Sequence, residues 1–336
     1  MLQIGIIGAG RIGKLHMRSI SNYVNNAKIK AVADPFLSED TAKWAKSLEI
    51  KYTTKDYHDI LNDPEIGAVL ICSSTDTHAP ISLEAIEAGK HVFCEKPVDH
   101  DVHKIRKVQN ALKDKPLKYQ VGFNRRFDHN FEAVHQAVQS GKVGVPEIIK
   151  ITSRDPEPPS PEYIKVSGGL FLDMTIHDFD MARFLAGSDP EEVYVQAAVL
   201  TDPRIGELGD VDTAIITLKM ENGALVVIDN CRRSVYGYDQ RAEVFGSKGM
   251  ANIKNDTASS CCISNDTGVV GEKPLYFFLE RYVQSYVKEI ASFVDAVVND
   301  TSVPVNIQDG LQAVRIGLAA QKSANEHRPV KLSEIG

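Results

Sequence analysis

Three glycines near the N-terminus constrain the fold of this chain more than any other feature. Gly8, Gly10 and Gly13 follow an apolar, β-rich run at Leu2–Ile7 and precede a segment with helical spacing. In this context the first glycine makes a tight turn, the second lets the backbone approach a pyrophosphate, and the third permits close packing of the helix. The N-terminus of that helix then faces the negative phosphates. The pattern predicts a site for a dinucleotide cofactor.

The acidic residue Asp34 indicates which dinucleotide binds. It ends the second predicted strand, about 20 residues after Gly13, where an acid accepts hydrogen bonds from the adenosine ribose. A carboxylate at this position repels a 2′-phosphate, so we expect NAD in preference to NADP. Binding of NADP remains an alternative, because the guanidinium of Arg11 would neutralise the charge of a 2′-phosphate that it reached.

Strand-like and helical segments alternate through the first third of the chain, as in a parallel sheet wrapped by helices. The predicted strands are Leu2–Ile7, Lys28–Ala33, Val69–Ser73 and His91–Cys94, and the predicted helices are Ile12–Val24, Glu39–Leu48, Ala79–Ala88 and Asp101–Leu112. We therefore expect an α/β fold that begins with a Rossmann domain, a doubly wound parallel sheet, over residues 1–122.

Beyond residue 122 the pattern changes. Helices are predicted at Phe131–Ser140, Leu172–Leu185, Phe277–Val298 and Ile307–Glu326, and strands at Glu147–Ser153, Glu192–Leu200, Thr213–Met220, Ala224–Asn230 and Arg241–Gly246. The β-branched strands and their turn residues predict an α+β domain with a large open, mixed or antiparallel sheet over residues 123–336. These strands, with Val193, Val195, Ala214 and Ile216 among their apolar residues, carry more than one helix layer needs to cover, so we expect a homo-oligomer.

Composition and charge exclude several classes of partner. The 38 basic and 45 acidic residues are mixed along the chain and give a formal net charge of -7, which argues against nucleic acid or an anionic membrane. No apolar run approaches the roughly 20 residues that span a bilayer, and nothing at the N-terminus resembles a signal peptide, so we expect neither feature. The five cysteines show no metal-ligand spacing, so we expect reduced thiols, no metal site and a cytoplasmic protein.

A lysine after the fourth predicted strand is the first candidate for catalysis. Lys96 follows Glu95 and precedes Pro97 at the carboxyl end of the strand, where it should project beside the nicotinamide. Oxidation of an alcohol moves a hydride to the cofactor while a proton leaves the hydroxyl. A lysine beside a cationic nicotinamide and partly out of water has its pKa lowered toward neutrality, so Lys96 can accept that proton.

Small hydroxyl residues end the third predicted strand at the same edge of the sheet, where they can approach the cofactor. His78, on the loop that follows, is interpreted as a loop or cofactor contact and not as a catalyst. The cofactor-binding residues that the sequence predicts are Gly8, Gly10, Arg11, Ile12, Gly13, Asp34, Ser73, Ser74, Thr75, His78, Glu95 and Lys96.

An acid and a histidine four residues apart form the second catalytic candidate. Asp173 and His177 fall within the predicted helix Leu172–Leu185, so they share one face and can act on one substrate together. The imidazole can accept a hydroxyl proton near neutral pH, and the carboxylate can hold a neighbouring hydroxyl. The residues alone do not decide whether Lys96 or His177 takes the proton. A divalent ion on Asp173, His177 and Asp180 is disfavoured, since no further ligand completes such a site.

Three motifs together resemble the Gfo/Idh/MocA oxidoreductases. Glu95-Lys96-Pro97 is similar to the hallmark triplet of that family, Gly122–Asp128 to the segment that joins its domains, and Gly168–Asp180 to its second catalytic motif. The resemblance covers essentially the whole chain and is closest to the inositol 2-dehydrogenases of the family. It implies NAD-dependent oxidation of a ring hydroxyl of a cyclic polyol to the ketone, and assembly into tetramers or dimers. The catalytic group that it implies is Lys96, Asp173 and His177.

A neutral polyol needs convergent donors and acceptors in its site, not a field of one charge. The substrate-binding candidates are Asn124, Arg126, Asp155, Tyr163, Asp173, His177 and Tyr236. The segment Arg154–Pro159 departs from the inositol enzymes of the family. Therefore scyllo-inositol, D-chiro-inositol and an aldopyranose are alternatives to myo-inositol.

Two other functions fit a Rossmann start of this kind. A catalytically silent NAD-sensing regulator would keep the fold and lose the chemistry, but the joint presence of Lys96, Asp173 and His177 argues against it. An enzyme that retains its nicotinamide cofactor and exchanges hydride between two sugars would carry an absorbing cofactor after purification.

Overall fold

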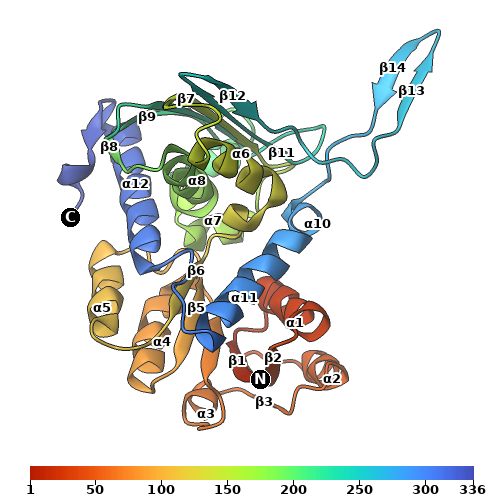
Figure 1. Ribbon diagram of the computed structural model, residues 1–336, viewed down its shortest axis with the longest axis vertical. Coiled ribbons are helices and arrows are strands. Elements are labelled where there is room, and N and C mark those ends of the chain that lie inside the picture. Colours follow the sequence, from red (N-terminus) through yellow and green to blue (C-terminus); the bar gives the residue numbers. More distant parts are fainter. The chain divides into compact units, whose positions relative to one another are not determined.

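The computed structural model describes residues 1–336, and the chain divides into two compact units (Figure 1). The first unit comprises Met1–Asn124 and Gln284–Val314, and the second comprises Arg125–Val283 and Arg315–Gly336. Each unit is built on one large sheet with helices packed against it.

A parallel sheet forms the centre of the first unit, as the alternating pattern predicted, but it has six strands and the sequence had indicated four. Its strands lie in the order β3-β2-β1-β4-β5-β6, and every neighbouring pair is parallel. The bounds are β1 Leu2–Ile7, β2 Ala27–Ala33, β3 Tyr52–Thr54, β4 Ala68–Ile71, β5 His91–Glu95 and β6 Tyr119–Gly122. The strand order reverses between β1 and β4, where open α/β sheets bind ligands beyond the carboxyl ends of their strands.

The helices of the first unit bury apolar residues against this sheet. Helix α1 (Arg11–Tyr23) places Met17 and Ile20 in one core with Ile4 of β1. Ser38 caps the next helix by accepting a hydrogen bond from the backbone N–H of Thr41, which satisfies a donor that the first helical turn leaves free. The helices after α1 are α2 Glu39–Ser47, α3 His58–Leu61, α4 Thr75–Glu87 and α5 Val102–Leu112.

Helix α11 (Val283–Val298) packs on the first unit, which the expected domain limits did not anticipate. Its buried residues Ile290, Phe293 and Val294 belong to the same core as Ile4 and Phe93. The sequence had placed this segment in the domain expected over residues 123–336. Helical spacing shows that one face of α11 is apolar, but it does not show which sheet that face covers.

A seven-stranded mixed sheet forms the second unit, in agreement with the expected open sheet. Its order is β12-β11-β7-β10-β9-β8-β15. Only β7 and β10 run parallel to each other, and the other neighbours are antiparallel. The bounds are β7 Pro146–Arg154, β8 Pro190–Ala198, β9 Thr213–Met220, β10 Leu225–Cys231, β11 Asp239–Gly246, β12 Gly249–Asn252 and β15 Val330–Lys331.

Helices cover one face of this sheet. Helix α8 contacts β7, and α6 contacts β11. None of the helices in the chain combines the length and the apolar character that a membrane span requires. The helical segments are η1 Asn124–Phe127, α6 His129–Gln139, α7 Pro161–Ser167, η2 Leu170–Met174, α8 Ile176–Ala186, α9 Pro203–Glu207, α10 Phe278–Arg281, α12 Ile307–Glu326 and η3 Leu332–Glu334.

The other face of the sheet exposes apolar side chains, but not those that the sequence analysis emphasised. Val193, Val195, Ala214 and Ile216 are buried on the covered face. The exposed row runs across three neighbouring strands, because Ile148 of β7 pairs with Leu225 of β10 and with Phe245 of β11. All three are more than a third exposed, at 40%, 54% and 44%.

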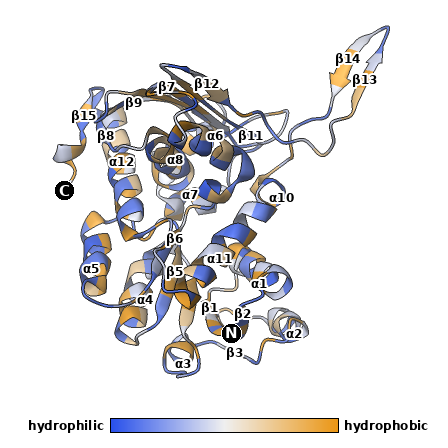
Figure 2. Cartoon of the chain, viewed as in Figure 1, coloured by the Kyte–Doolittle hydropathy of each residue, from blue (hydrophilic) through white to orange (hydrophobic).

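A separate hairpin, β13 (Cys262–Asn265) and β14 (Gly268–Gly271), pairs only with itself. Figure 2 shows apolar residues on β14, where Val269 and Val270 are 72% and 65% exposed. These short strands were not predicted, because all of their residues are exposed and their sequence lacks the alternation of apolar and polar residues that a half-buried strand shows.

Candidate functional site

The glycine loop of the first unit has the geometry of a phosphate cradle. Gly8 has φ +100°, and a Cβ there would lie 2.6 Å from the carbonyl carbon of Cys72. A Cβ on Gly13 would lie 2.0 Å from the Gly8 carbonyl oxygen, whereas one on Gly10 would meet nothing within 4 Å. Gly10 precedes α1, whose first turn has no side-chain cap. Its N–H groups and the open space at Gly10 therefore fit the pyrophosphate of a dinucleotide.

Asp34 links the end of β2 to the glycine loop. One carboxylate oxygen accepts a 2.7 Å hydrogen bond from the Ala9 N–H, and the other accepts a 2.8 Å bond from the Phe36 N–H. A carboxylate has about four lone-pair sites, so both oxygens can still accept from a ribose hydroxyl. The structure therefore places Asp34 beside the cradle and adds a role that the sequence did not indicate, which is to hold the loop.

Ser73 and Ser74 follow β4, but Thr75 and the buried His78 lie in the first turn of α4, so the loop position expected for His78 is wrong. The hydroxyls of Ser73 and Thr77 lie 2.6 Å apart. The ring nitrogens of His78 lie 2.7 Å from the Pro97 carbonyl oxygen and 3.0 Å from that of Ser73. Burial lowers the pKa of His78, but Cys94 and these two carbonyls raise it, and the result is a pKa of about 9. His78 is then an imidazolium that ties the β4–α4 loop to the segment after Lys96.

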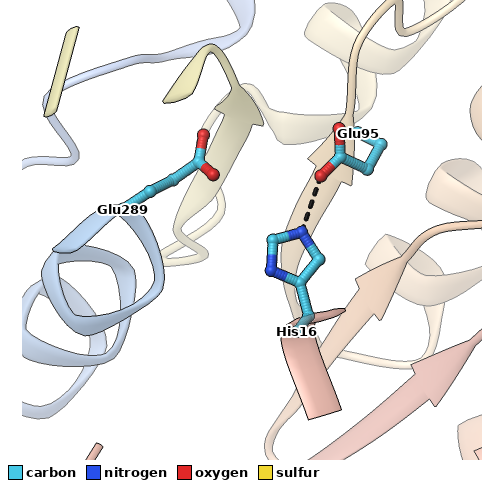
Figure 3. Close-up of side chains that lie close together, drawn as sticks. All are labelled: His16, Glu95 and Glu289. Atoms are coloured by element: carbon cyan, nitrogen blue, oxygen red, sulfur yellow. Dashed lines mark hydrogen bonds and ion pairs between the residues drawn. The ribbon is translucent and has the colours of Figure 1, made fainter. Parts of the chain in front are cut away.

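Lys96 lies directly after β5 and is half-buried. Its neighbour Glu95, predicted to contact the cofactor, is only 9% exposed. Figure 3 shows the Glu95 side chain directed at His16 of α1, and the two groups are joined by a 2.6 Å hydrogen bond between Glu95 Oε1 and His16 Nε2. The helix that begins at the glycine loop is thereby bonded to the strand end that leads into Lys96.

Asp173 and His177 lie on two helical segments of the second unit, and the single helix predicted at Leu172–Leu185 is wrong. Asp173 lies in the π-helical turn Leu170–Met174, and α8 begins at Ile176, so that His177 lies in its first turn. The backbone N–H of Thr175 donates to the Leu170 carbonyl, five residues back. Short π-helical turns of this kind are frequent at functional sites.

A cluster of polar side chains surrounds Asp173. The Tyr163 hydroxyl donates a 2.8 Å hydrogen bond to Asp173 Oδ1. Arg232 Nη2 lies 3.5 Å from Asp173 Oδ2, and Arg232 Nη1 lies 4.0 Å from Asp155 Oδ2. Burial raises the pKa of Asp155 to about 6, although Arg232 opposes the shift. The structure thus brings three predicted residues, Asp155, Tyr163 and Asp173, together around one guanidinium.

Arg232 is the residue of this cluster that the sequence analysis missed. It follows β10 and is 1% exposed, and its Nε and Nη2 atoms make no hydrogen bond. The one sequence feature that could have identified Arg232 is its position shortly after a predicted strand. Strands β7 and β10 are parallel, with Arg154 paired to Cys231. The residues that follow them, Asp155 and Arg232, therefore emerge at the same edge of the sheet.

The remaining substrate candidates are held by other partners. Asn124, in the first unit, is 2% exposed and donates to Ser285. Arg126 binds both carboxylate oxygens of Asp180, at 2.8 and 2.6 Å.

Tyr236 belongs to a separate hydrogen-bonded group with Asp239 and Arg154, and its side chain is 40% exposed. Its hydroxyl donates to Asp239 at 2.6 Å and accepts from Arg154 at 3.2 Å. The structure does not bring Tyr236 to the cluster at Asp173.

Family models match both halves of the chain. Residues 2–123 match the oxidoreductase family with an NAD-binding Rossmann fold, and residues 131–252 match the GFO/IDH/MocA C-terminal domain. The chain belongs to the Gfo/Idh/MocA oxidoreductase family. The motifs at Lys96 and Asp173 had indicated this family, and its NAD-binding fold accounts for the glycine loop.

Full-length relatives include inositol dehydrogenases. The myo-inositol 2-dehydrogenase of Thermotoga maritima is 45% identical, over 99% of each chain. A solved myo-inositol dehydrogenase of Corynebacterium glutamicum is 36% identical with a TM-score of 0.93, over 99% of each chain. A scyllo-inositol dehydrogenase of Lactobacillus casei, solved with NAD(H) and scyllo-inositol, is 30% identical with a TM-score of 0.92, also over 99% of each chain.

Proposed function

We propose that this protein is an NAD-dependent dehydrogenase that oxidises one ring hydroxyl of an inositol to the ketone. The observation that carries the proposal is the cluster at Asp173, which presents a carboxylate, a phenol and a second carboxylate around one buried guanidinium. Such a set can bond several neutral hydroxyls at once. Full-length likeness to dehydrogenases of myo-inositol and scyllo-inositol supports the same substrate class.

The proposed catalytic group consists of Lys96 from the first unit and Asp173 and His177 from the second. NAD supplies the hydride acceptor when it is bound. As the C–H bond of the carbinol breaks toward the nicotinamide, the hydroxyl loses its proton to Lys96 or His177, and the products are a ketone, NADH and one proton. Asp173 holds a hydroxyl of the ring, and the Tyr163 bond fixes the orientation of its carboxylate.

Cofactor binding is assigned to the first unit. The proposed residues are the glycine loop with Arg11 and Ile12, the carboxylate of Asp34, and the Ser73, Ser74 and Thr75 segment at the end of β4. His78 and Glu95 act on this site indirectly, through the loop and the helix to which they are bonded.

The decisive test is an initial-rate panel. Reduction of NAD and of NADP is measured with myo-, scyllo- and D-chiro-inositol and with D-glucose. One inositol that dominates with NAD would name the substrate, and preference for D-glucose would favour an aldose dehydrogenase of the same family. Binding of NAD without turnover of any polyol would favour the regulator. An absorbing cofactor retained through purification would favour hydride exchange between sugars.

Replacement of Asp34 should change the choice of cofactor. In Asp34→Ser the acceptor for the ribose hydroxyls weakens and the charge that repels a 2′-phosphate disappears. We expect kcat/KM for NAD to fall about tenfold, as for one lost charge-assisted hydrogen bond, and the ratio of NAD to NADP efficiency to fall further. Asp40→Ser, at an exposed acid on α2, is the control. An unchanged ratio in Asp34→Ser would remove the assignment.

Self-association is proposed through the exposed row Ile148, Leu225 and Phe245, as a dimer or tetramer. A charge in this row should destabilise the interface, since an aspartate buried without a partner costs several kcal/mol. We expect Leu225→Asp to lower the mass measured by light scattering at micromolar concentration, while Val166→Asp, at a 69% exposed site on α7, leaves it unchanged. A monomeric wild-type protein would rule out the proposal.

All five cysteines are free, which suits a reducing, cytoplasmic location.

A further inference from the structure

The first unit contains three ionisable side chains that converge in its interior. Figure 3 shows His16 of α1, Glu95 of β5 and Glu289 of α11 directed toward one another. One polar side-chain atom of each residue, an imidazole nitrogen or a carboxylate oxygen, lies within 4.8 Å of the corresponding atoms of the other two. His16 and Glu289 are 0% exposed and Glu95 is 9% exposed.

The partners of the two carboxylates differ. Glu95 Oε1 accepts from His16 Nε2 at 2.6 Å, but neither oxygen of Glu289 has a hydrogen-bond partner. If both acids were ionised, the buried cluster would carry two negative charges against at most one imidazolium. An isolated buried carboxylate is costly enough that it takes up a proton instead. The proton belongs on Glu289, which is more buried than Glu95 and lacks the hydrogen bond that would stabilise its charge.

We propose that Glu289 is a neutral carboxylic acid in the folded protein, and that it shares its proton with Glu95 through one water, so that the cluster holds the strand end leading into Lys96. One oxygen of each carboxyl lies within 4.8 Å of the other, a separation that a single water can bridge. Glu289 would then be a positioning residue. Its effect on Lys96 rests on the proposed dehydrogenase function, whereas its protonation does not.

The groups around the cluster support a proton on Glu289. Burial and the charge of Glu95 raise the pKa of Glu289. Directly after β4, the Cys72 thiol has its pKa raised by burial and by the charge of Glu95. On β6, the neutral amide of Gln120 donates to the Glu289 backbone carbonyl at 3.0 Å. His16 is flanked by the rings of Phe93 and Tyr286.

The dependence of stability on pH tests the protonation. A carboxyl whose pKa is raised by folding takes up a proton when the chain folds, so the wild-type protein loses stability as pH rises from the unfolded pKa to the folded one. Glu289→Gln is neutral at every pH and lacks this loss. The folding equilibrium constant of wild type relative to Glu289→Gln should fall by up to tenfold per pH unit between about pH 5 and the folded pKa. Asp295→Asn, an exposed acid-to-amide change on α11, should instead parallel wild type.

Two further measurements complete the test. Wild type should show an infrared band of a protonated carboxylic acid that Glu289→Gln lacks. If the positioning role holds, Glu289→Met, which has no donor, should lower kcat about tenfold with little change in KM, and Glu289→Gln should restore most of it. Parallel pH curves for wild type and Glu289→Gln, or one divalent ion per chain that Glu289→Gln loses, would overturn the protonation. Equal kcat for the Met and Gln variants would overturn only the positioning role.

Discussion

Lys96→Ala should abolish most turnover while NAD still binds. Loss of a positioned acid or base costs about 10²–10⁴ in rate, so we expect kcat to fall about 10³-fold. The glycine loop and Asp34 remain intact in this variant, so the affinity for NAD, measured by quenching of protein fluorescence, should change by less than about threefold. The two readouts together separate a catalytic lysine from one that only holds the cofactor.

The control is Lys107→Ala, which removes an exposed lysine from α5 of the same unit and should keep wild-type kcat. A second variant, His177→Ala, decides between the two candidate bases. If Lys96 accepts the proton, external alkylamines should restore part of the rate of Lys96→Ala and none of that of His177→Ala. Turnover by Lys96→Ala within tenfold of wild type would exclude the lysine as the base.

Features that depend on neighbouring residues in the chain were predictable from the sequence. The glycine loop, the acid at the end of β2 and the lysine after β5 all lie where local spacing and strand ends indicated. Predicted strand and helix limits in the first unit match most closely where apolar runs are long, as at Leu2–Ile7. The three-residue strand β3 was missed because so short a run carries no periodic signal.

Features set by contacts between distant segments were not predictable. The pairing of β7 with β10 places Arg232 between Asp155 and Asp173, and no spacing within one segment shows this. The π-helical turn at Asp173 also escaped prediction, because its apolar pattern matches that of an α-helix. Glu289 likewise fits the spacing of an amphipathic helix, and the sequence does not show that it is fully buried beside Glu95 of a distant strand.

Arg232→Met should damage both activity and stability, since the side chain is buried between two acids. Removing one partner of a buried charge cluster leaves the other charges uncompensated and costs about 3 kcal/mol. Arg232 makes no hydrogen bond through Nε or Nη2, so the loss should be mainly electrostatic. We expect kcat/KM for the inositol to fall about 10²-fold, as for a loss of about 2.7 kcal/mol in the transition state, and the denaturant midpoint to fall with it.

The pH profile identifies the cause of that loss. Burial raises the pKa of Asp155 to about 6 while Arg232 lowers it, so loss of the guanidinium must raise that pKa further. Below its pKa Asp155 is protonated and accepts hydroxyl protons weakly. The acid limb of kcat/KM should therefore lie near pH 6 in wild type and shift upward in Arg232→Met. Arg232→Lys keeps the charge and should keep the limb, and Arg233→Met, at the exposed neighbour, should match wild type throughout. An unshifted acid limb in Arg232→Met, with equal loss of rate at every pH, would show that Arg232 supports the fold alone and does not set the charge of the site.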